Sequence, residues 1–509
     1  MKVLSCRFKY TILMTVFAAA GLCSSAYAQT NNVSLPDTAA GWVKAVRQDI
    51  NEAYQLTLDN HPGTYDKHNP DFKKNLDLAR DNALALADKV KDAAAYTAVM
   101  DRFNVSLHDG HAGVRTSIPA TTATAIRWPG FITVWRGNGL YVYAAEDGKP
   151  GAGSEVVNCD GKPVRQLIED NVFSYKGRSD EAGHWWVYSG ELFIDNGNPF
   201  VHAPQSCQFK QQGQITTQKI EWQDKNDNLM KWARSAYAGE KLPVGITEPR
   251  KNLLWVAMPT FQPNAAEQKA YDDMAQDITE HRERALHADA IVIDLRHNQG
   301  GSSAWSKQFA YALWGKDRVT RQLSAYSPNT EVWWRASPGN TRHMLDLAEK
   351  LSKDNRSDMA AWAKRHGESM QAALAKKENF YIQQSQSLAD KPDLSLTDLP
   401  TDPPPLKTPV YVIVAGNCAS ACLDALDVFT RFANTTLIGA PSAADSTYME
   451  VRIQPLPSGL ARVVIPTKVY VNRQRGAGQV YQPAITATDL VWSVSNFQKI
   501  VEQDLARRK

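Results

Sequence analysis

The chain changes from an apolar run to a helical pattern within residues 410–424. The β-branched run Val410–Val414 indicates a buried strand, Gly416-Asn417 ends it, and a helix pattern begins at Ser420. A hydroxyl at such a junction lies beside free backbone N–H groups and the positive end of the helix dipole. The position suits a serine nucleophile and the oxyanion that it creates, and it equally suits a serine that only caps the helix.

The N-terminus has the pattern of a secretory signal peptide over residues 1–28. Three basic residues precede an apolar run over residues 10–22, and Ala26-Tyr27-Ala28 forms a cleavage site of the small-x-small type. No later apolar run is long enough to span a bilayer. We therefore predict export to the periplasm or secretion, and no integral membrane segment in the mature chain.

The charge balance excludes one class of partner. The full chain has 57 basic and 54 acidic residues, and residues 1–28 hold three of the basic and none of the acidic ones, which leaves 54 of each. Proteins that bind nucleic acid usually carry a basic stripe, and none is visible in this sequence. We predict no nucleic-acid partner.

The cysteines of the mature chain are Cys159, Cys207, Cys418 and Cys422. In an oxidising compartment Cys159 and Cys207 are candidates for a disulfide, although connectivity cannot be read from sequence. Cys418 and Cys422 flank Ser420 and either pair or remain small buried thiols. The spacing of cysteines and histidines fits no structural zinc site. We predict no metal and no cofactor.

The region before residue 105 has helical periodicity. Apolar residues recur every four positions within Asp37–Leu58, and His61-Pro62-Gly63 breaks this helix. Further helices are expected over Phe72–Lys91 and Ala93–Phe103.

The segment that follows, Leu107–Val114, contains two histidines around an Asp-Gly turn. His108 and His111 lack a third metal ligand at a suitable spacing, and either could be a solvated or core-bonded imidazole. If one is catalytic, His111 is better placed, because its small neighbours let another segment approach.

Short strands and turns dominate residues 127–222. Phe131–Trp135 and Gly139–Tyr143 indicate strands, and Asp160-Gly161 indicates a turn before a helix start. The length of this region and its alternation of short strands and turns are typical of a small peptide-binding module, which would add an extended peptide to a sheet edge. A β-sandwich insertion without a ligand has the same pattern.

From residue 252 the pattern is α/β. Leu253–Met258 and Ala288–Leu295 indicate buried strands, and the second leads into Gly300-Gly301 and a helix. Backbone N–H groups exposed at that helix start suit an anion. Neither phosphate-loop motif is present, and glycine here can also serve close packing alone. Strand–helix alternation predicts a parallel core sheet with right-handed crossovers.

A polar insertion, residues 315–405, interrupts this core. Helical stretches are expected over Thr341–Lys353 and Ser357–Lys376, before Pro403-Pro404-Pro405. The insertion could be a lid over a cleft or a peripheral decoration.

Taken together, these blocks resemble the C-terminal processing (tail-specific) proteases, a family that includes the tricorn core protease and the interphotoreceptor retinoid-binding protein. Leu107–Val114 resembles its Asp-x-His-Thr motif, and Gly161–Val164 resembles the end of its PDZ-like domain. Ile293–Gly301 resembles its Asp-Leu-Arg-x-Asn-x-Gly-Gly motif, which is the most specific match. Cys418–Ala421 resembles its nucleophile motif, and Ile438–Pro441 follows at the right distance.

The departures from the family pattern bear on the mechanism. The bacterial tail-specific branch pairs its serine with a lysine about two dozen residues later, whereas this region, residues 443–447, has none. The tricorn-like branch uses the histidine of the Asp-x-His block, and His111 occupies that position. The residue that would orient its imidazole is left open among four candidates: Asp109, Asp445, Glu450 and Gln479. Leu423 replaces the usual acidic residue three positions after the nucleophile.

The resemblance implies an α/β multidomain protein, with a ClpP/crotonase-like catalytic core over residues 246–509 that carries the helical insertion. A helical domain over residues 29–125 and a PDZ-like domain over residues 126–245 would precede it. The implied activity is that of an exported serine endopeptidase acting on a protein or peptide substrate.

In this interpretation Ser420 is the nucleophile and His111 the general base, and the N–H groups of Gly301 and Ala421 hold the oxyanion. The alternative is a non-catalytic member of the same fold that binds a peptide or an apolar ligand. An α/β-hydrolase esterase is disfavoured because Gly416–Asp424 lacks G-x-S-x-G.

Overall fold

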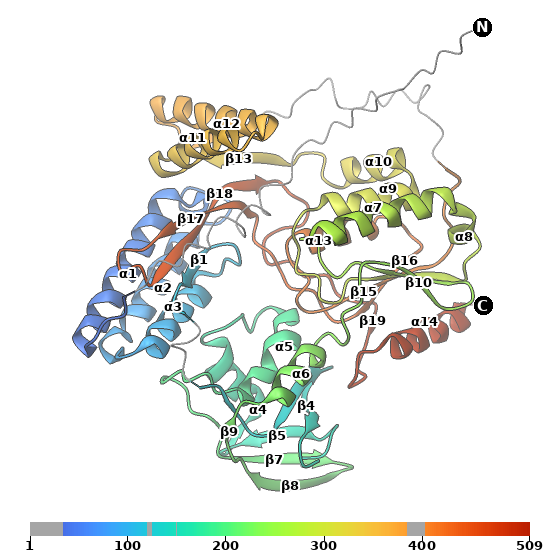
Figure 1. Ribbon diagram of the computed structural model, residues 1–509, viewed down its shortest axis with the longest axis horizontal. Coiled ribbons are helices and arrows are strands. Elements are labelled where there is room, and N and C mark those ends of the chain that lie inside the picture. The colour runs from blue at the N-terminus through green and yellow to red at the C-terminus, as the bar shows by residue number, and fades with distance from the viewer. Residues whose placement is uncertain (1–33, 120–124, 149, 384–402, 509) are drawn as a thin grey trace.

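The computed structural model of the chain describes residues 34–508 except 120–124, 149 and 384–402, and Figure 1 shows how its elements are arranged. The predicted signal peptide therefore lies outside the described residues. Within the described part, no helix combines the length and the apolar character that crossing a bilayer requires.

Helices form the N-terminal layer: α1 (Ala39–Asn60), α2 (Phe72–Leu84) and α3 (Ala93–Leu107). Thr38 caps α1 by accepting the N–H of Gly41, and the short helix η2 (Pro62–Thr64) follows the predicted break. The helix expected over Phe72–Lys91 ends earlier, and a separate turn, η3 (Ala87–Lys89), follows it. The apolar face of α1 is buried, which confirms the predicted periodicity.

These helices pack on an antiparallel sheet built from distant parts of the chain, in the order β1–β18–β13–β14, with β17 also paired to β18. The strands are β1 (Gly113–Thr116), β13 (Glu331–Arg335), β14 (Phe380–Gln383), β17 (Tyr448–Pro455) and β18 (Ala461–Val471). Val463 and Ile465 of β18 share a core with Val46 of α1. Because β1 begins two residues after His111, this sheet fixes where the His111 loop lies.

The insertion contains α10 (Lys316–Tyr326) and a hairpin of α11 (Pro338–Lys353) and α12 (Ser357–Ala375), which lies over β13 (Figure 1). Trp334, Met344 and Trp362 form its small core. The helices are as predicted, and the insertion also contains the strands β13, which holds Trp333-Trp334, and β14. Strand β13 finds its hydrogen-bonding partner in the distant β18, which a local pattern cannot show.

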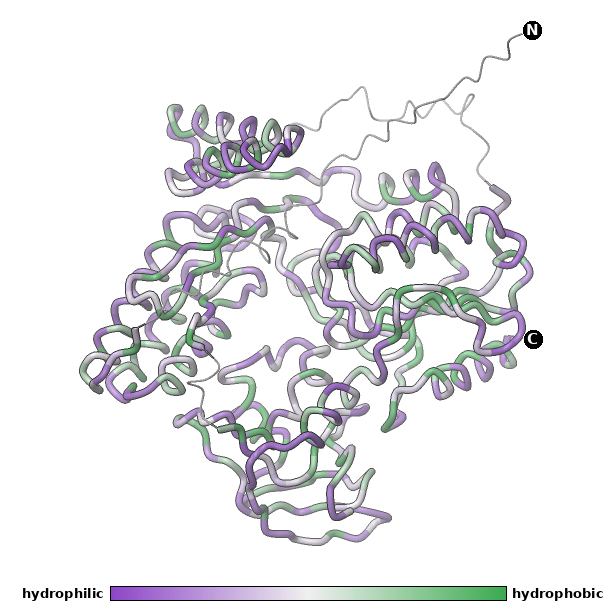
Figure 2. The backbone as a smooth tube through the Cα atoms, in the orientation of Figure 1, coloured by the Kyte–Doolittle hydropathy of each residue, from purple (hydrophilic) through white to green (hydrophobic). Residues whose placement is uncertain are grey.

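The second sheet has the order β10–β11–β12–β15–β16–β19, and all its pairs except β10–β11 are parallel. Its strands are β10 (Gly245–Arg250), β11 (Leu253–Ala257), β12 (Ala290–Asp294), β15 (Val410–Val414), β16 (Thr435–Gly439) and β19 (Ile485–Thr486). The predicted parallel core is confirmed. Apolar residues concentrate along these strands, as Figure 2 shows.

Helices cover both faces of this parallel sheet: α7 (Ala265–Glu280), α8 (Arg282–Leu286), α9 (Ala304–Trp314), α13 (Ala421–Phe429) and α14 (Val494–Arg508). Ile291 and Ile293 pack with Phe309 of α9, whereas Val292 between them packs with Val501 of α14. Alternate side chains of one strand therefore enter different cores, as expected for a strand buried on both faces.

The β-rich region between these parts has a sheet in the order β3–β4–β5–β7–β8, with β6 on β5 and a separate β2–β9 pair. Its elements are β2 (Arg127–Trp128), β3 (Phe131–Arg136), β4 (Gly139–Ala145), β5 (Glu155–Cys159), β6 (Lys162–Pro163), α4 (Val164–Ile168), η5 (Glu169–Phe173), α5 (Ala182–Tyr188), η6 (Ser189–Phe193), β7 (Ser206–Gln211), β8 (Gln214–Lys219), β9 (Gln223–Asp224) and α6 (Asp227–Ala236).

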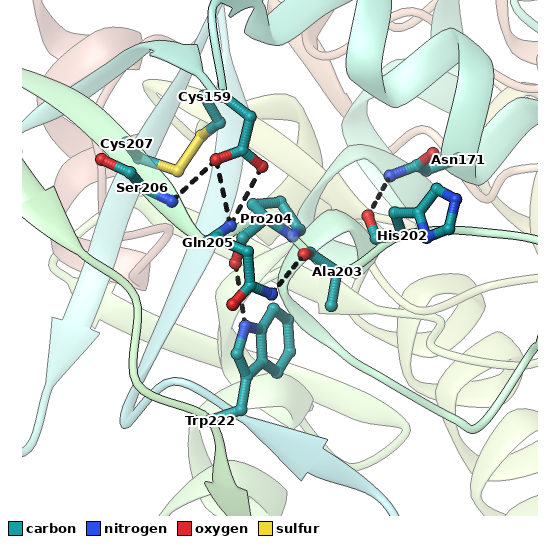
Figure 3. The surroundings of a disulfide bond; sticks show 10 residues. Cys159, Asn171, His202, Ala203, Pro204, Gln205, Ser206, Cys207 and Trp222 are labelled. Atoms are coloured by element: carbon teal, nitrogen blue, oxygen red, sulfur yellow. Dashed lines mark hydrogen bonds between the residues drawn. A yellow bond between two sulfur atoms is a disulfide. The ribbon is translucent and has the colours of Figure 1, made fainter.

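A disulfide links two adjacent strands of this sheet. Cys159 of β5 and Cys207 of β7 face each other in the strand register and are bonded, as predicted (Figure 3). Beside it, the N–H of the Trp222 indole donates to the carbonyl of Pro204. We call residues 126–245 the middle region. That it is PDZ-like stays a prediction, as do the domain boundaries.

Candidate active site

Ser420 lies between β15 and α13, at the junction that the sequence predicts. Its backbone has φ 55° and ψ −124°, a conformation that costs a residue with a side chain about 1–3 kcal/mol. The Ser420 hydroxyl accepts no hydrogen bond from the described N–H groups of α13. Ser420 therefore does not use its side chain as a helix cap, and the strained backbone is typical of a functional position.

A disulfide joins the residues two positions before and two positions after Ser420. Cys418 and Cys422, both fully buried, are bonded to each other across Ser420. Of the two alternatives that the sequence leaves open for these cysteines, pairing is the one found. The bond links the loop before Ser420 to the first turn of α13, so it restrains the backbone on both sides of the hydroxyl.

Asp445 contacts both Ser420 and His111. Its Oδ2 accepts the backbone N–H of Ser420 at 3.1 Å. Its Oδ1 lies 3.1 Å from Nδ1 of His111, although the bond directions place this second contact outside hydrogen-bond geometry. The Asp445 side chain is 3% exposed and that of His111 is 20% exposed. Burial raises the pKa of Asp445, and the neighbouring His111 acts in the opposite direction.

Asp109 contacts the backbone of His111 rather than its ring. This buried carboxylate accepts the N–H of His111 at 2.9 Å, the hydroxyl of Ser446 at 2.8 Å and Nε2 of His61 at 2.9 Å. Nδ1 of His61 accepts the N–H of Gly63, so the proton of that ring lies on Nε2. Burial alone would raise the pKa of Asp109, but the hydrogen bond from His61 and nearby histidine charge lower it.

The glycine pair lies against the serine. Gly300 has φ 101°, and a Cβ atom there would lie 2.8 Å from Cβ of Ser420 and 2.7 Å from the carbonyl oxygen of Ala419. The N–H of Gly300 donates to Oδ1 of Asn298. Across the described residues, by contrast, the N–H groups of Gly301 and Ala421 have no hydrogen-bond acceptor. N–H groups without an acceptor among the described residues therefore lie in the glycine loop and directly after Ser420.

Ser420, His111 and Asp445 line one cleft of about 780 Å³. The other walls come from the β1 and α3 segments and from the middle region, which contributes residues of β3, α5 and α6. No described residue of the insertion 315–405 lines this cleft, and whether the insertion acts as a lid stays a prediction. Within the described ranges, no group of three or more His, Cys, Asp or Glu side chains is arranged to hold a metal ion.

Comparisons with known proteins identify the core. The sequence profile of peptidase family S41 matches residues 252–485, which include the glycine pair, Ser420 and Asp445. The core of this chain belongs to peptidase family S41. It is a serine-type peptidase, and the predicted resemblance to C-terminal processing and tricorn-like proteases is confirmed at the level of the family.

Solved structures extend the similarity of this S41 peptidase beyond its core. Mature CPAF complexed with lactacystin is 13% identical, with a TM-score of 0.56 over 91% of this chain and 98% of that chain. Mature CPAF alone is 14% identical, with a TM-score of 0.57 over 91% and 96%. The photosystem II D1 C-terminal processing protease is 14% identical, with a TM-score of only 0.32 over 88% of this chain and 95% of that chain. No curated protein matches the chain significantly.

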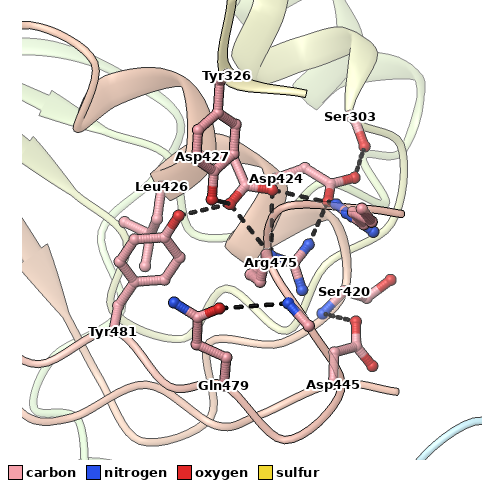
Figure 4. Close-up of polar contacts among 12 residues, drawn as sticks. Ser303, Tyr326, Ser420, Asp424, Leu426, Asp427, Asp445, Arg475, Gln479 and Tyr481 are labelled. Carbon is pink, nitrogen blue, oxygen red and sulfur yellow. Dashed lines mark hydrogen bonds and ion pairs between the residues drawn. The ribbon is translucent and has the colours of Figure 1, made fainter. Parts of the chain in front are cut away.

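An ionic network fixes α13, the helix that follows Ser420 in the S41 core (Figure 4). Asp424 of α13 accepts the hydroxyl of Ser303, just after the glycine pair, at 2.5 Å, and it also pairs with Arg473 and Arg475. Burial alone would raise the pKa of Asp424, but the two arginine charges lower it to about 2. Leu423, which replaces the usual acidic residue, is buried in the core, and the next residue makes the ionic contacts.

The other sequence candidates for orienting His111 have different contacts. Glu450 pairs with Lys468 at 3.3 Å, and the side chain of Gln479 accepts the N–H of Gly476. Sequence reasoning missed His61, which it interpreted only as part of a helix break. Its partner Asp109 lies 48 residues away, so no local signal marks the contact.

Proposed function

We propose that this S41 peptidase is an endopeptidase with a Ser420–His111–Asp445 triad. Ser420 Oγ attacks the substrate carbonyl, and His111 accepts its proton and then returns it to the leaving amine. Asp445 holds the imidazole and stabilises the imidazolium that forms. The observation that carries the proposal is the double contact of Asp445 with the N–H of Ser420 and with Nδ1 of His111.

The oxyanion would be bound by the N–H groups of Gly301 and Ala421. Their lack of an acceptor among the described residues supports this role, because donors left free in the resting enzyme cost no reorganisation during the reaction. The close approach of Gly300 to Ser420 brings the glycine loop next to the nucleophile.

The substrate would be an extended protein or peptide chain that binds between the middle region and the core. In the described sheet, β3 is an edge strand, and its residues Ile132, Thr133 and Val134 line the cleft. A strand edge beside a cleft can accept a peptide as a further strand, as expected of a PDZ-like module, but β3 is itself buried and the backbone of Gly190 lies close to the carbonyl of Thr133. Export of the protein is supported by the disulfides at Cys159–Cys207 and Cys418–Cys422, since such bonds persist in oxidising compartments.

Labelling of the purified mature protein with a fluorophosphonate probe tests the proposal. Wild type should be labelled, and Ser420→Ala and His111→Ala should not. Folded wild type that is never labelled, with or without candidate peptides, would instead support the non-catalytic binding protein of the same fold.

A further inference from the structure

One segment of the middle region, residues 178–187, contacts the loops that carry all three triad residues. Nη1 of Arg178 reaches the carbonyl of His108 in the His111 loop at 3.4 Å. Glu181 accepts the N–H of Ala444, next to Asp445, at 3.0 Å. We call residues 178–187 the bridging segment.

The same segment packs against the nucleophile loop. A Cβ atom on Gly416, four residues before Ser420, would lie 2.2 Å from the carbonyl oxygen of Gly183 and 3.0 Å from Val187. A Cβ atom on Gly183 would in turn lie 2.3 Å from the carbonyl oxygen of Ser442. Glycine at both positions therefore allows a direct backbone approach between α5 and the two loops.

Glu181 is the central residue of the bridging segment. It is 7% exposed, and it pairs with Arg178 at 3.3 Å and with Nε2 of His184 at 3.2 Å. Burial raises the pKa of Glu181, and the hydrogen bond from Ala444 opposes the rise. Nδ1 of His184 accepts the N–H of Arg178, and burial lowers the pKa of His184 to about 4, so this ring is neutral near pH 7.

The backbone next to Asp445 is held from both sides. Glu181 binds the N–H of Ala444, and the N–H of Gly478 donates to the carbonyl of Asp445. Ser442 exchanges further hydrogen bonds with Tyr481. On the side of the middle region, Glu181 is the side chain that provides the acceptor. Removing it would leave the partly buried N–H of Ala444 without its acceptor, so this backbone would be held from one side only.

We propose that Glu181 is a positioning residue of the active site, which fixes the Ala444–Asp445 backbone and thereby the alignment of Asp445 with His111. The proposal rests on the proposed triad and extends it, because the middle region then completes the catalytic geometry as well as lining the cleft. Glu181 lines the cleft, but in this scheme it supplies none of the reacting atoms and acts through Asp445.

The test compares Glu181→Ala with Glu181→Gln by the kinetics of fluorophosphonate labelling. The alanine variant should lose about tenfold or more in the maximal labelling rate with little change in the probe concentration for half-maximal rate. Glutamine keeps a side-chain oxygen that can accept the N–H of Ala444, so it should restore most of that rate. Hydrogen exchange of residues 442–446 should rise in the alanine variant and remain slow in the glutamine variant.

Glu146→Ala is the matched control. Glu146 belongs to the same region and accepts side-chain hydrogen bonds from Gln223, Asn226 and Asn228, but it lies outside the cleft. A Glu181→Ala enzyme that is labelled like Glu146→Ala and wild type would overturn the positioning role and leave the triad intact. Wild type without labelling would overturn the triad itself, and the role of Glu181 with it.

Discussion

The side chain of Asp445 accepts a hydrogen bond from the backbone N–H of Ser420, with 3.1 Å between Oδ2 and the serine nitrogen, although 25 residues separate the two in sequence. The other oxygen of the same carboxylate faces His111 at 3.1 Å. One buried carboxylate therefore contacts both the Ser420 loop and the ring of His111.

Asp445→Asn should lower the rate of fluorophosphonate labelling by about three to four orders of magnitude, as loss of the acid does in other triads. The amide cannot stabilise an imidazolium, although it can still accept the N–H of Ser420. Gln479→Ala is the control, because Gln479 is exposed and contacts Gly476 rather than His111. Equal labelling of both variants would exclude Asp445 from the triad.

Removal of one disulfide should mainly lower the stability of the protein, whereas removal of the other should mainly lower its labelling rate. Loop-closure entropy assigns about 4 kcal/mol to Cys159–Cys207, with a sequence separation of 48, and about 2 kcal/mol to Cys418–Cys422, with a separation of 4. The Cys159→Ala, Cys207→Ala double variant should therefore lose more in denaturation midpoint. The Cys418→Ala, Cys422→Ala double variant should lose more labelling, at least tenfold, because it frees the strained backbone of Ser420. The reverse order of effects on labelling would refute a role for the second bond.

Asp101 should make stability depend on pH. This residue of α3 lines the cleft, and burial raises its pKa to about 7 from 3.8, with the charge of Lys176 acting against the rise. Between about pH 4 and pH 7 the folded state keeps a proton that the unfolded state releases, so stability falls as the pH rises.

Asp101→Asn removes this dependence. The variant should match wild type near pH 4 and exceed it at pH 8 by about 1–3 kcal/mol in urea unfolding, a figure reduced from the full shift because Asp101 is partly exposed. A constant difference between the two proteins across this pH range would show that Asp101 titrates normally.

Patterns within single segments predicted much of the fold and part of the site. The strand that ends before Ser420 and the glycine pair after β12 are set by neighbouring residues, and they are where the sequence places them. The strands of the insertion and the contact of Asp445 with His111 depend instead on pairing between distant segments. Asp109 and Ser446, for example, are 337 residues apart and meet only because β1 and β17 flank the same strand.

The glycine loop offers a test in which a single methyl group is the only change. Gly300→Ala places a Cβ atom 2.8 Å from that of Ser420, at a φ of 101° that alanine rarely adopts, so the loop or the serine must move. Labelling should fall at least a hundredfold, because displacing the loop also displaces the N–H of Gly301 that would bind the oxyanion. Gly110→Ala adds the same methyl group beside His111, where nothing lies within 4 Å and φ is not positive. That variant should be labelled within about twofold of wild type, since a methyl group with no contacts disturbs neither packing nor backbone. If Gly300→Ala is instead labelled as fast as Gly110→Ala, the close approach of the two loops has no catalytic role, and the oxyanion must be bound by other groups.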